Sequence, residues 1–491
     1  MQKQKSSFVE LFTKKVKNYL SNDFINLDIN NSIGDAIDKI QHLKKSTILV
    51  TKNNKLAGII TEQDISRRIV FKSNCDEPIK NFMTSPVIFV YEEDLLFHAV
   101  GEMRKSKLRH LPVVNLNEEI MGILNLHEAL SAELGVSMER IDSITFSKDE
   151  EGINSLKAKQ VSLAEGMMKE YVNPEDITYI LSSLNNVVYR RSIRIAIDRT
   201  QKKNILEKIP EFCVLAMGSA GRMESFLHPD QDNGLIYNLD KNDDPKKVDM
   251  YFKVMAKEFT KILDTAGIPF CKGDMMASNS LWRNSLQEWK NQFDQWVDVS
   301  DDLTLRYIDM LYDFRPVYGN PELAKEFRTH ILKKLERTPS FLKYLYRRDS
   351  ETNAGIGLFG QFILEKKDKN NLGLLNLKHT GTLPLVEATR MYSIKHKLRE
   401  VSTLERLKKL TELKIFNKDE FDFFKNAHRF ISNILLKNQI ESAKTNKKIK
   451  NYINPKKLLN REKKLLKIYF KEIRKLRAKV KMDFSGTVVH I

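Results

Sequence analysis

The chain has 491 residues, which exceeds the size of a single hydrophobic core and predicts about three or four domains. Its composition, 41% hydrophobic and 30% charged, is typical of globular proteins, and no apolar run approaches the roughly 18 residues that a membrane span needs, which excludes a membrane partner. The net charge of +18 is concentrated near one end of the chain, so it does not by itself predict a nucleic-acid-binding groove.

The N-terminal segment, residues 1–21, has a helical pattern and lacks the apolar stretch of a secretory signal. The three cysteines lie far apart, with neither disulfide nor zinc-site spacing, and are expected to be reduced, structural thiols. We therefore expect a cytoplasmic protein.

A repeated unit follows this segment. Residues 46–65 (STILVTKNNKLAGIITEQDI) and 109–130 (RHLPVVNLNEEIMGILNLHEAL) both contain an apolar strand, a polar turn, a second apolar strand and a helix start. A helical pattern precedes each copy. Residues 22–135 thus resemble a tandem pair of CBS domains, and this resemblance implies an adenine nucleotide as ligand and a homodimer formed through the pair.

The polar residues that close the second strand are the candidate ligand site of the CBS pair. In the resembling family an acidic side chain binds the ribose and a hydroxyl binds the phosphates, and Thr61 and Asp64 match this pattern. The second copy departs from it, with Asn125 and Glu128. The alternative is that Thr61 only caps the helix that begins near Gln63.

Residues 150–205 show helical spacing and are predicted to form a helical connector. A buried strand (EFCVLAMGS) then ends in a Gly-Ser turn, after which AGRMESFL is predicted to begin a helix. Glycine in such a turn allows close approach of a phosphate. Asp230 and Asp232 follow at the start of an extended segment, so both carboxylates point to one side and could hold Mg²⁺ against substrate phosphates.

Strand, turn and Asp-x-Asp in this order resemble the nucleotidyltransferase superfamily of DNA polymerase β, over residues 206–335. The stretches GSAGRMES…DQDN, MASNSLWRNSLQEW and YDFRPVYGN are more similar to protein-PII uridylyltransferases and to a family of nucleotidyltransferases that follow a CBS pair. This resemblance implies an NTP substrate, Gly218 and Ser219 as the phosphate turn with Arg222 nearby, and Asp230 and Asp232 as metal ligands.

A third carboxylate normally completes the metal site of such enzymes. Chain order favours Asp274, on an apparent strand IPFCKGDMM, whereas the resemblance favours Asp313 in YDFRPVYG as a catalytic residue. The alternative for both is a surface aspartate or a salt-bridge partner. Trp282, Trp289 and Trp296 recur every seven residues, as on one buried face of a helix.

Residues 340–491 are predicted to be helical and resemble the substrate-binding domain of this transferase family. Residues 441–480 contain fifteen Lys or Arg against three Glu, around an apolar stripe of helical spacing. This pattern predicts a packed helix with a solvated basic face rather than an RNA-binding surface. The histidines of this region show no metal-ligand spacing.

The sequence therefore predicts a multidomain α/β and α protein: a tandem CBS pair, a helical connector, a polymerase-β-like nucleotidyltransferase core and a helical C-terminal domain. The expected activity is transfer of a nucleoside monophosphate from an NTP to an acceptor hydroxyl, with a protein as a candidate acceptor. The alternative is a catalytically inactive, nucleotide-sensing partner-binding protein.

Overall fold

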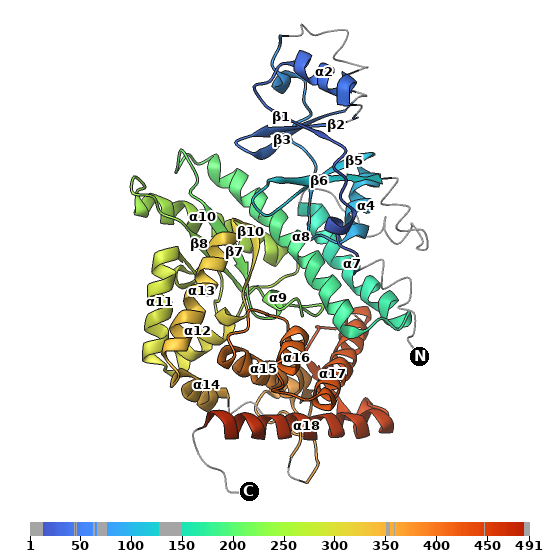
Figure 1. The fold of residues 1–491 in the computed structure, drawn as a ribbon. Coiled ribbons are helices and arrows are strands. Elements are labelled where there is room, and N and C mark those ends of the chain that lie inside the picture. Colours follow the sequence, from blue (N-terminus) through green and yellow to red (C-terminus); the bar gives the residue numbers. More distant parts are fainter. Residues whose placement is uncertain are drawn as a thin grey trace. The chain divides into compact units, whose positions relative to one another are not determined.

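The computed structural model describes residues 13–43, 45, 47–61, 64–65, 76–126, 150–349, 354–357, 359–445 and 447–485 (Figure 1). The chain divides into two compact units, residues 1–159 and 160–491, and the boundary falls within helix α7 (Glu150–Lys169). Among the described residues, no helix is long and apolar enough to cross a membrane.

The first unit contains two three-stranded sheets with the same order and strand directions. In each, the first strand is parallel to the second and the second is antiparallel to the third. The elements are η1 (Val16–Tyr19), β1 (Ile25–Asp28), α2 (Ile33–Leu43), β2 (Thr47–Lys52), β3 (Lys55–Thr61), η3 (Ile79–Asn81), β4 (Val90–Tyr91), α4 (Leu96–Lys105), β5 (His110–Val114) and β6 (Ile120–Asn125). The predicted repeat is confirmed.

The hairpin between β2 and β3 shows why the repeat forms locally. Its two turn residues, Asn53 and Asn54, have φ of 52° and 63°, the left-handed pair that matches the twist of the flanking strands. The five buried residues at positions 47–51 give β2 a continuous apolar or β-branched run. Thr47 and Thr61 are paired at the open end of the hairpin, where the second strand ends.

The second unit is built on a mixed four-stranded sheet in the order β10-β7-β8-β9. Its strands are β7 (Phe212–Ala216), β8 (Asn233–Tyr237), β9 (Arg283–Ser285) and β10 (Arg315–Gly319). β7 is antiparallel to both β8 and β10, and β8 is parallel to β9. This sheet positions the turn after β7 beside the segment that enters β8.

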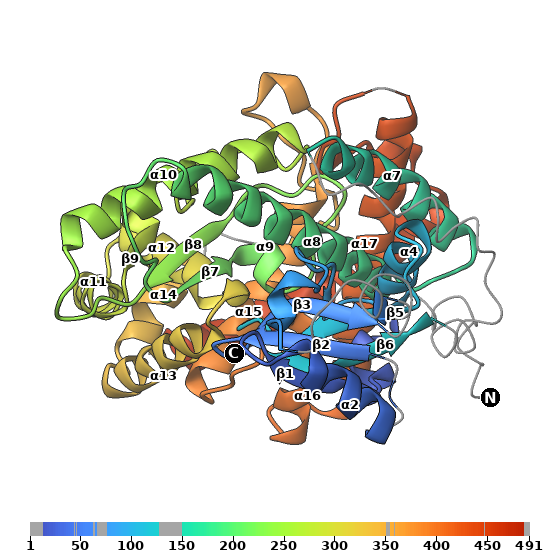
Figure 2. The ribbon, with the colours of Figure 1, turned by 90° about the horizontal axis from the view of Figure 1, so that it is seen from above.

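Helices cover both faces of this sheet (Figure 2). Tyr237 stacks on Phe252 of α10, whereas the adjacent Ile236 belongs to the core cluster that includes Trp289 of α11, because successive strand residues point to opposite faces. The helices are α8 (Pro174–Gln201), α9 (Gly218–Gly221), α10 (Pro245–Thr265), η4 (Ser280–Trp282), α11 (Leu286–Val299), α12 (Asp302–Tyr312), α13 (Pro321–Arg337) and α14 (Phe341–Asp349).

The C-terminal region is helical, as predicted, with one short antiparallel strand pair. Its elements are η5 (Lys369–Asn371), β11 (Leu375–Asn376), η6 (Lys378–Thr382), α15 (Leu383–Lys395), α16 (Thr403–Glu412), α17 (Lys418–Lys444), β12 (Tyr452–Ile453), η7 (Pro455–Lys457) and α18 (Asn460–Phe484). One side of the basic α18 is buried, including Leu466, Ile473 and Val480, which confirms the packed-helix interpretation.

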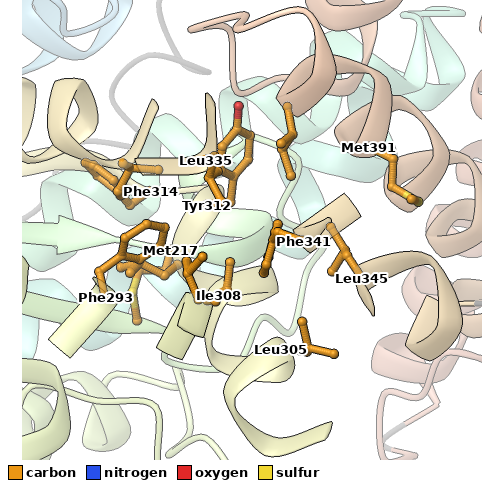
Figure 3. Packing of buried hydrophobic residues seen from close by; sticks show 14 of the residues in the cluster. Met217, Phe293, Leu305, Ile308, Tyr312, Phe314, Leu335, Phe341, Leu345 and Met391 are labelled. Carbon is orange, nitrogen blue, oxygen red and sulfur yellow. The ribbon is translucent and has the colours of Figure 1, made fainter. Parts of the chain in front are cut away.

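A continuous hydrophobic core joins the sheet to the C-terminal helices (Figure 3). It extends from Met217 beside the sheet, through Ile308 and Phe341, to Met391 of α15 and Phe484 of α18. The regions before and after residue 340, which the sequence presents as two domains, therefore pack as one unit.

The tryptophans belong to this core and are buried, as predicted. Trp289 and Trp296 lie on α11, but Trp282 precedes that helix in η4, so the three do not form a stripe on one helix. The Nε1 group of Trp289 donates a hydrogen bond to the carbonyl oxygen of Leu235 (2.9 Å), which fixes α11 against β8.

Candidate active site

The turn after β7 brings the backbone against a carboxylate. Gly218 has φ of 56°, and a Cβ atom there would lie 2.8 Å from Cε of Met310 and 3.0 Å from Oδ2 of Asp232. The left-handed conformation favours glycine, and any larger side chain would have to displace the ends of the Met310 and Asp232 side chains. The predicted helix over AGRMESFL is not formed: α9 has four residues and ends before Met223, whose φ is 60°.

Two aspartates flank a buried glutamine just before β8. The Gln231 side-chain amide donates to the carbonyl oxygens of Thr260 and Ile268, both at 2.8 Å, which anchors the segment from behind. Asp230 is exposed and Asp232 is partly buried. In an extended segment, residues two apart lie on the same side, so the expectation for Asp230 and Asp232 is that both carboxylates lie opposite the glutamine side chain.

Asp232 lies in a mixed electrostatic environment. The pKa of its carboxyl is raised to about 6, chiefly by burial and additionally by the charge of Asp230. A hydrogen bond from the Cys271 thiol and the positive charge of Lys378 act in the opposite direction and lower this pKa. The carboxylate thus faces a second acid, a thiol and a cation, a combination suited to binding a metal ion and phosphate together.

Cys271 and Lys378 were not identified from the sequence. Cys271 was interpreted only as a structural thiol, although it immediately follows Phe270, whose backbone pairs with Gln231. Lys378 comes from η6 in the C-terminal region, and nothing in its local sequence indicates that it approaches Asp232.

Asp274 does not lie on a strand of the sheet. The predicted strand IPFCKGDMM is wrong: the structure has a single bridge at Phe270 and then a turn in which Asp274 has φ of 54°. Its exposed carboxylate accepts a hydrogen bond from Nδ2 of Asn279 (3.0 Å). The strand beside β8 is β9, Arg283–Ser285, which contains no acidic residue.

Asp313 is fully buried in a cluster of arginines. Its Oδ2 atom lies 2.6 Å from Arg222 and 2.8 Å from Arg390, and its Oδ1 atom lies 2.7 Å from Arg406. Arg390 also contacts Asp309. A carboxylate enclosed in this way has no free face for a metal ion, so the geometry favours a structural role over the catalytic role expected from the sequence.

Arg222 belongs to the same ionic cluster. Its guanidinium is buried, and its Nε donates to Glu224 at 2.8 Å while its Nη1 contacts Asp313. Both contacts compensate its charge internally, so the guanidinium is not displayed as a phosphate ligand. Within the described part of the chain, no three His, Cys, Asp or Glu side chains are grouped closely enough to hold a metal ion.

A cavity of about 820 Å³ lies near the turn after β7, although Gly218, Ser219, Asp230 and Asp232 are not among its described lining residues. Met310, which limits the space at Gly218, is part of its wall, and so is His379, the neighbour of Lys378. Arg306, Arg347, Asp301 and Glu387 are among its other lining residues. Its volume falls in the range of small-molecule sites, and its walls carry both charge signs.

In the first unit, Thr61 and Asp64 contact each other. Oδ2 of Asp64 accepts hydrogen bonds from the backbone N–H (2.9 Å) and the hydroxyl (2.8 Å) of Thr61. This is the local pairing expected of a helix cap, and it also presents both groups at the end of β3. Asn125 ends β6, and Glu128 lies outside the described residues.

Family models match the chain in the order that the sequence predicts. Residues 16–70 and 79–135 match the CBS domain. Residues 158–302 match a family described as "Putative nucleotidyltransferase DUF294", and residues 339–484 match one described as "Putative nucleotidyltransferase substrate binding domain". The CBS pair, the transferase domain and the substrate-binding domain are therefore confirmed, and the transferase match begins inside the predicted connector.

Two curated relatives illustrate the extent of sequence similarity. CBS domain-containing protein CBSCBSPB1 of Arabidopsis thaliana is 30% identical over 120 residues, which cover 24% of this chain and 22% of the relative. An uncharacterized 17.7 kDa protein of Acidianus ambivalens is 30% identical over 108 residues, which cover 22% of this chain and 65% of the relative. The chain thus matches less than two thirds of the length of either relative.

Solved structures with local similarity include CBS domain protein PAE2072 from Pyrobaculum aerophilum, complexed with AMP. It is 21% identical, with a TM-score of 0.22, and covers 23% of this chain and 88% of its own. A CBS domain pair/ACT domain protein from Thermotoga maritima is 22% identical, with a TM-score of 0.22. The match covers 24% of this chain and 96% of the Thermotoga maritima chain.

Proposed function

We propose that this chain, which belongs to the proteins that join a CBS pair to a DUF294 nucleotidyltransferase domain and its substrate-binding domain, transfers a nucleoside monophosphate from an NTP to an acceptor hydroxyl and releases pyrophosphate. The observation that carries the proposal is the geometry at Gly218. The turn after β7 lies so close to the Asp232 carboxylate that a Cβ atom at Gly218 would be 3.0 Å from Oδ2 of Asp232. Such proximity would let the backbone of the turn, and a metal ion held by the carboxylate, contact the same substrate phosphate.

Asp230 and Asp232 would hold Mg²⁺ together with the substrate phosphates. Two carboxylates on one side of an extended segment are a suitable donor set, because Mg²⁺ prefers oxygen ligands and commonly completes its shell with phosphate and water. The ion would neutralise charge that develops on the transferring phosphate. Gln231 keeps the pair in place through its two buried hydrogen bonds.

Other residues would bind and orient the triphosphate. Gly218 and Ser219 provide backbone close to the phosphates, and Lys378 supplies a positive charge from the C-terminal region. The cavity of about 820 Å³, whose wall includes Met310 and His379, has room for a nucleotide. Arg222 would support the turn through the buried ionic cluster rather than contact the substrate.

The finer parts of the proposal are the acceptor and the regulation. Similarity to the uridylyltransferases suggests a protein hydroxyl as acceptor. The CBS pair would bind an adenine nucleotide near Thr61 and Asp64 and would form a homodimer with the CBS pair of a second copy of the chain. The nucleotide would alter the transfer activity because it binds two conformational states of the chain with different affinity.

The decisive experiment compares Asp232→Asn with Asp274→Asn. Both substitutions remove one carboxylate charge at nearly constant volume, but only Asp232 contacts the phosphate turn. Wild type and Asp274→Asn should transfer label from a radioactive NTP with Mg²⁺ to an acceptor in cell extract, whereas Asp232→Asn should lose at least about a hundredfold in rate, since several kcal/mol of stabilisation depend on a metal ligand. Full activity of Asp232→Asn would refute the mechanism.

A catalytically inactive, nucleotide-sensing protein is the second candidate. The favouring observation is that Asp313 is enclosed by arginines and that β9 carries no acid, so the described residues offer a pair rather than a trio of carboxylates. NTP binding that depends on Asp232, without transfer to any fraction of the extract, would support this function instead.

A further inference from the structure

The outward side of α18, which lies along one edge of the second unit, carries a row of exposed side chains (Figure 1). Residues spaced alternately three and four apart share one side of a helix. Those on the outward side, here called the basic stripe, are Arg461, Lys464, Ile468, Lys471, Lys475, Ala478 and Met482, and all are exposed. At a helical rise of about 1.5 Å per residue, the stripe is roughly 30 Å long.

Neighbouring carboxylates leave most of the positive charge of the basic stripe uncompensated. Lys475 pairs with Glu472 at 2.7 Å. Arg461, Lys464 and Lys471 have no ion-pair partner among the described residues. The two other acidic residues of α18 accept hydrogen bonds at the two ends of the helix. The stripe therefore favours an anionic partner.

A hairpin next to α18 presents an aromatic ring to solvent. Residues 355–357 and 359–363 form its two sides, here called the Phe359 hairpin, and are joined by an antiparallel bridge and backbone hydrogen bonds. Gly360, with φ of 75°, allows the turn. Phe359 stands at the tip and is 95% exposed. An apolar ring in this position indicates a surface that a partner covers.

Three contacts fix the Phe359 hairpin against α18. The ring of Phe362 meets that of Phe470 edge-on, with 6.2 Å between centroids, and Nζ of Lys467 lies 5.3 Å from the centroid of the Phe362 ring. Nη1 of Arg474 donates to the carbonyl oxygen of Gly357 at 3.3 Å. Hairpin and stripe thus form one surface, in which apolar side chains stand among cations.

This combination of side chains favours one kind of partner. The phosphates of RNA would attract the cations, but an aliphatic side chain such as Ile468, 48% exposed, has no partner on a phosphate backbone. An acidic protein would need pockets shaped for Phe359 and Ile468. A bilayer of anionic phospholipids needs no pockets, because its headgroups attract Lys and Arg and its acyl boundary takes up apolar side chains anywhere on its surface.

We infer that the basic stripe and the Phe359 hairpin attach the chain to an anionic phospholipid surface. The cations lie against the headgroups, and Phe359 and Ile468 enter the boundary between headgroups and acyl chains. Such attachment needs no helix that crosses the membrane, and the described residues contain none. The lack of a long apolar run in the sequence excludes a span and does not bear on a surface contact. The attachment is independent of whether the chain transfers nucleotides.

The test is co-sedimentation of the full chain with vesicles of phosphatidylcholine, alone or mixed with phosphatidylglycerol. We expect binding to the mixed vesicles only, and weaker binding at physiological than at low salt, because salt screens the charges. Single-stranded poly(U) is the probe for an RNA-binding surface. Absence of binding to the mixed vesicles overturns the inference, whether or not poly(U) binds, and so does equal binding to both kinds of vesicle.

The double substitution Lys464→Gln and Lys471→Gln should weaken binding to the mixed vesicles at least about tenfold, since each lysine near an anionic surface contributes to affinity. Lys253→Gln with Lys257→Gln is the matched control, because both lysines are exposed on α10 and the net charge changes equally. All four side chains are exposed, so folding should be preserved. Equal weakening by the two pairs would mean that net charge alone matters, which overturns the inference.

Phe359→Ser should weaken binding to the mixed vesicles about fivefold or more without changing its salt dependence, because an apolar contact is lost and no charge is removed. Tyr171→Ser is the control, since Tyr171 is a 93% exposed aromatic residue at the turn between α7 and α8. Equal affinities of these two variants would overturn the insertion of the hairpin.

Discussion

Asp313→Asn would test whether this residue holds the second unit together or serves catalysis. The substitution keeps the side-chain volume but leaves Arg222, Arg390 and Arg406 facing a neutral amide, and these residues are 8%, 3% and 0% exposed. Removing one partner of a buried ion pair costs about 3–5 kcal/mol. With a urea dependence of roughly 3 kcal/mol per molar, the unfolding midpoint should fall by between about 1 and 2 M.

Tryptophan fluorescence makes this measurement specific. The chain has three tryptophans, and all are buried in the core of the second unit, so urea unfolding followed by their emission reports on that unit alone. Asp298→Asn is the control, because Asp298 is 63% exposed and pairs with Lys334 at the surface, where an ion pair contributes about 0–1 kcal/mol. Equal midpoints for the two variants would refute the structural role. An Asp313→Asn protein of normal stability that has lost transfer would restore the catalytic assignment.

Gly221→Ala should abolish folding of the second unit, because the added Cβ would lie 1.7 Å from the carbonyl oxygen of Asp313. Gly166→Ala is the control: no neighbouring atom lies within 4 Å of the added Cβ, so this substitution should stabilise α7 by about 0.5–1 kcal/mol. Similar urea midpoints for the two would contradict this. Gly218→Ala forces alanine into φ of 56° at a cost of about 1–2 kcal/mol and should weaken NTP binding in calorimetry; unchanged affinity would remove the turn from the site. Asp64→Ala should weaken AMP, ADP or ATP binding to the full chain in calorimetry, with circular dichroism as the folding control; unaltered affinity would exclude Asp64 from the CBS ligand site.

The features that could be predicted from the sequence depend on neighbours in the chain. The CBS repeat shows as two copies of one short pattern, and turns such as Asn53-Asn54 close its hairpins locally. The Gly218 turn and the Asp230–Asp232 pair also depend on local conformation, namely a left-handed glycine and the alternation of an extended segment. Hydrophobic spacing was sufficient to predict that the tryptophans are buried, although not that Trp282 lies outside α11.

Two predicted elements are wrong because contacts with distant segments, rather than the local residues, determine the structure there. The segment IPFCKGDMM has strand-like composition, yet the place beside β8 is taken by Arg283–Ser285, so Asp274 is left in a turn. The segment after Gly218 has good helix-forming residues, but Arg222 turns inward to the Asp313 carboxylate and α9 ends after one turn.

The chemistry of the candidate sites was decided by contacts between distant parts of the chain. The local motif around Asp313 resembles that of a catalytic residue. In the folded unit, however, Asp313 is a buried counter-ion, because Arg390 and Arg406 of the C-terminal helices contact its carboxylate. Lys378 comes close to Asp232 in the same way. Burial and charge pairing determine what a carboxylate or an imidazole can do, and both are properties of the packed unit rather than of a stretch of sequence.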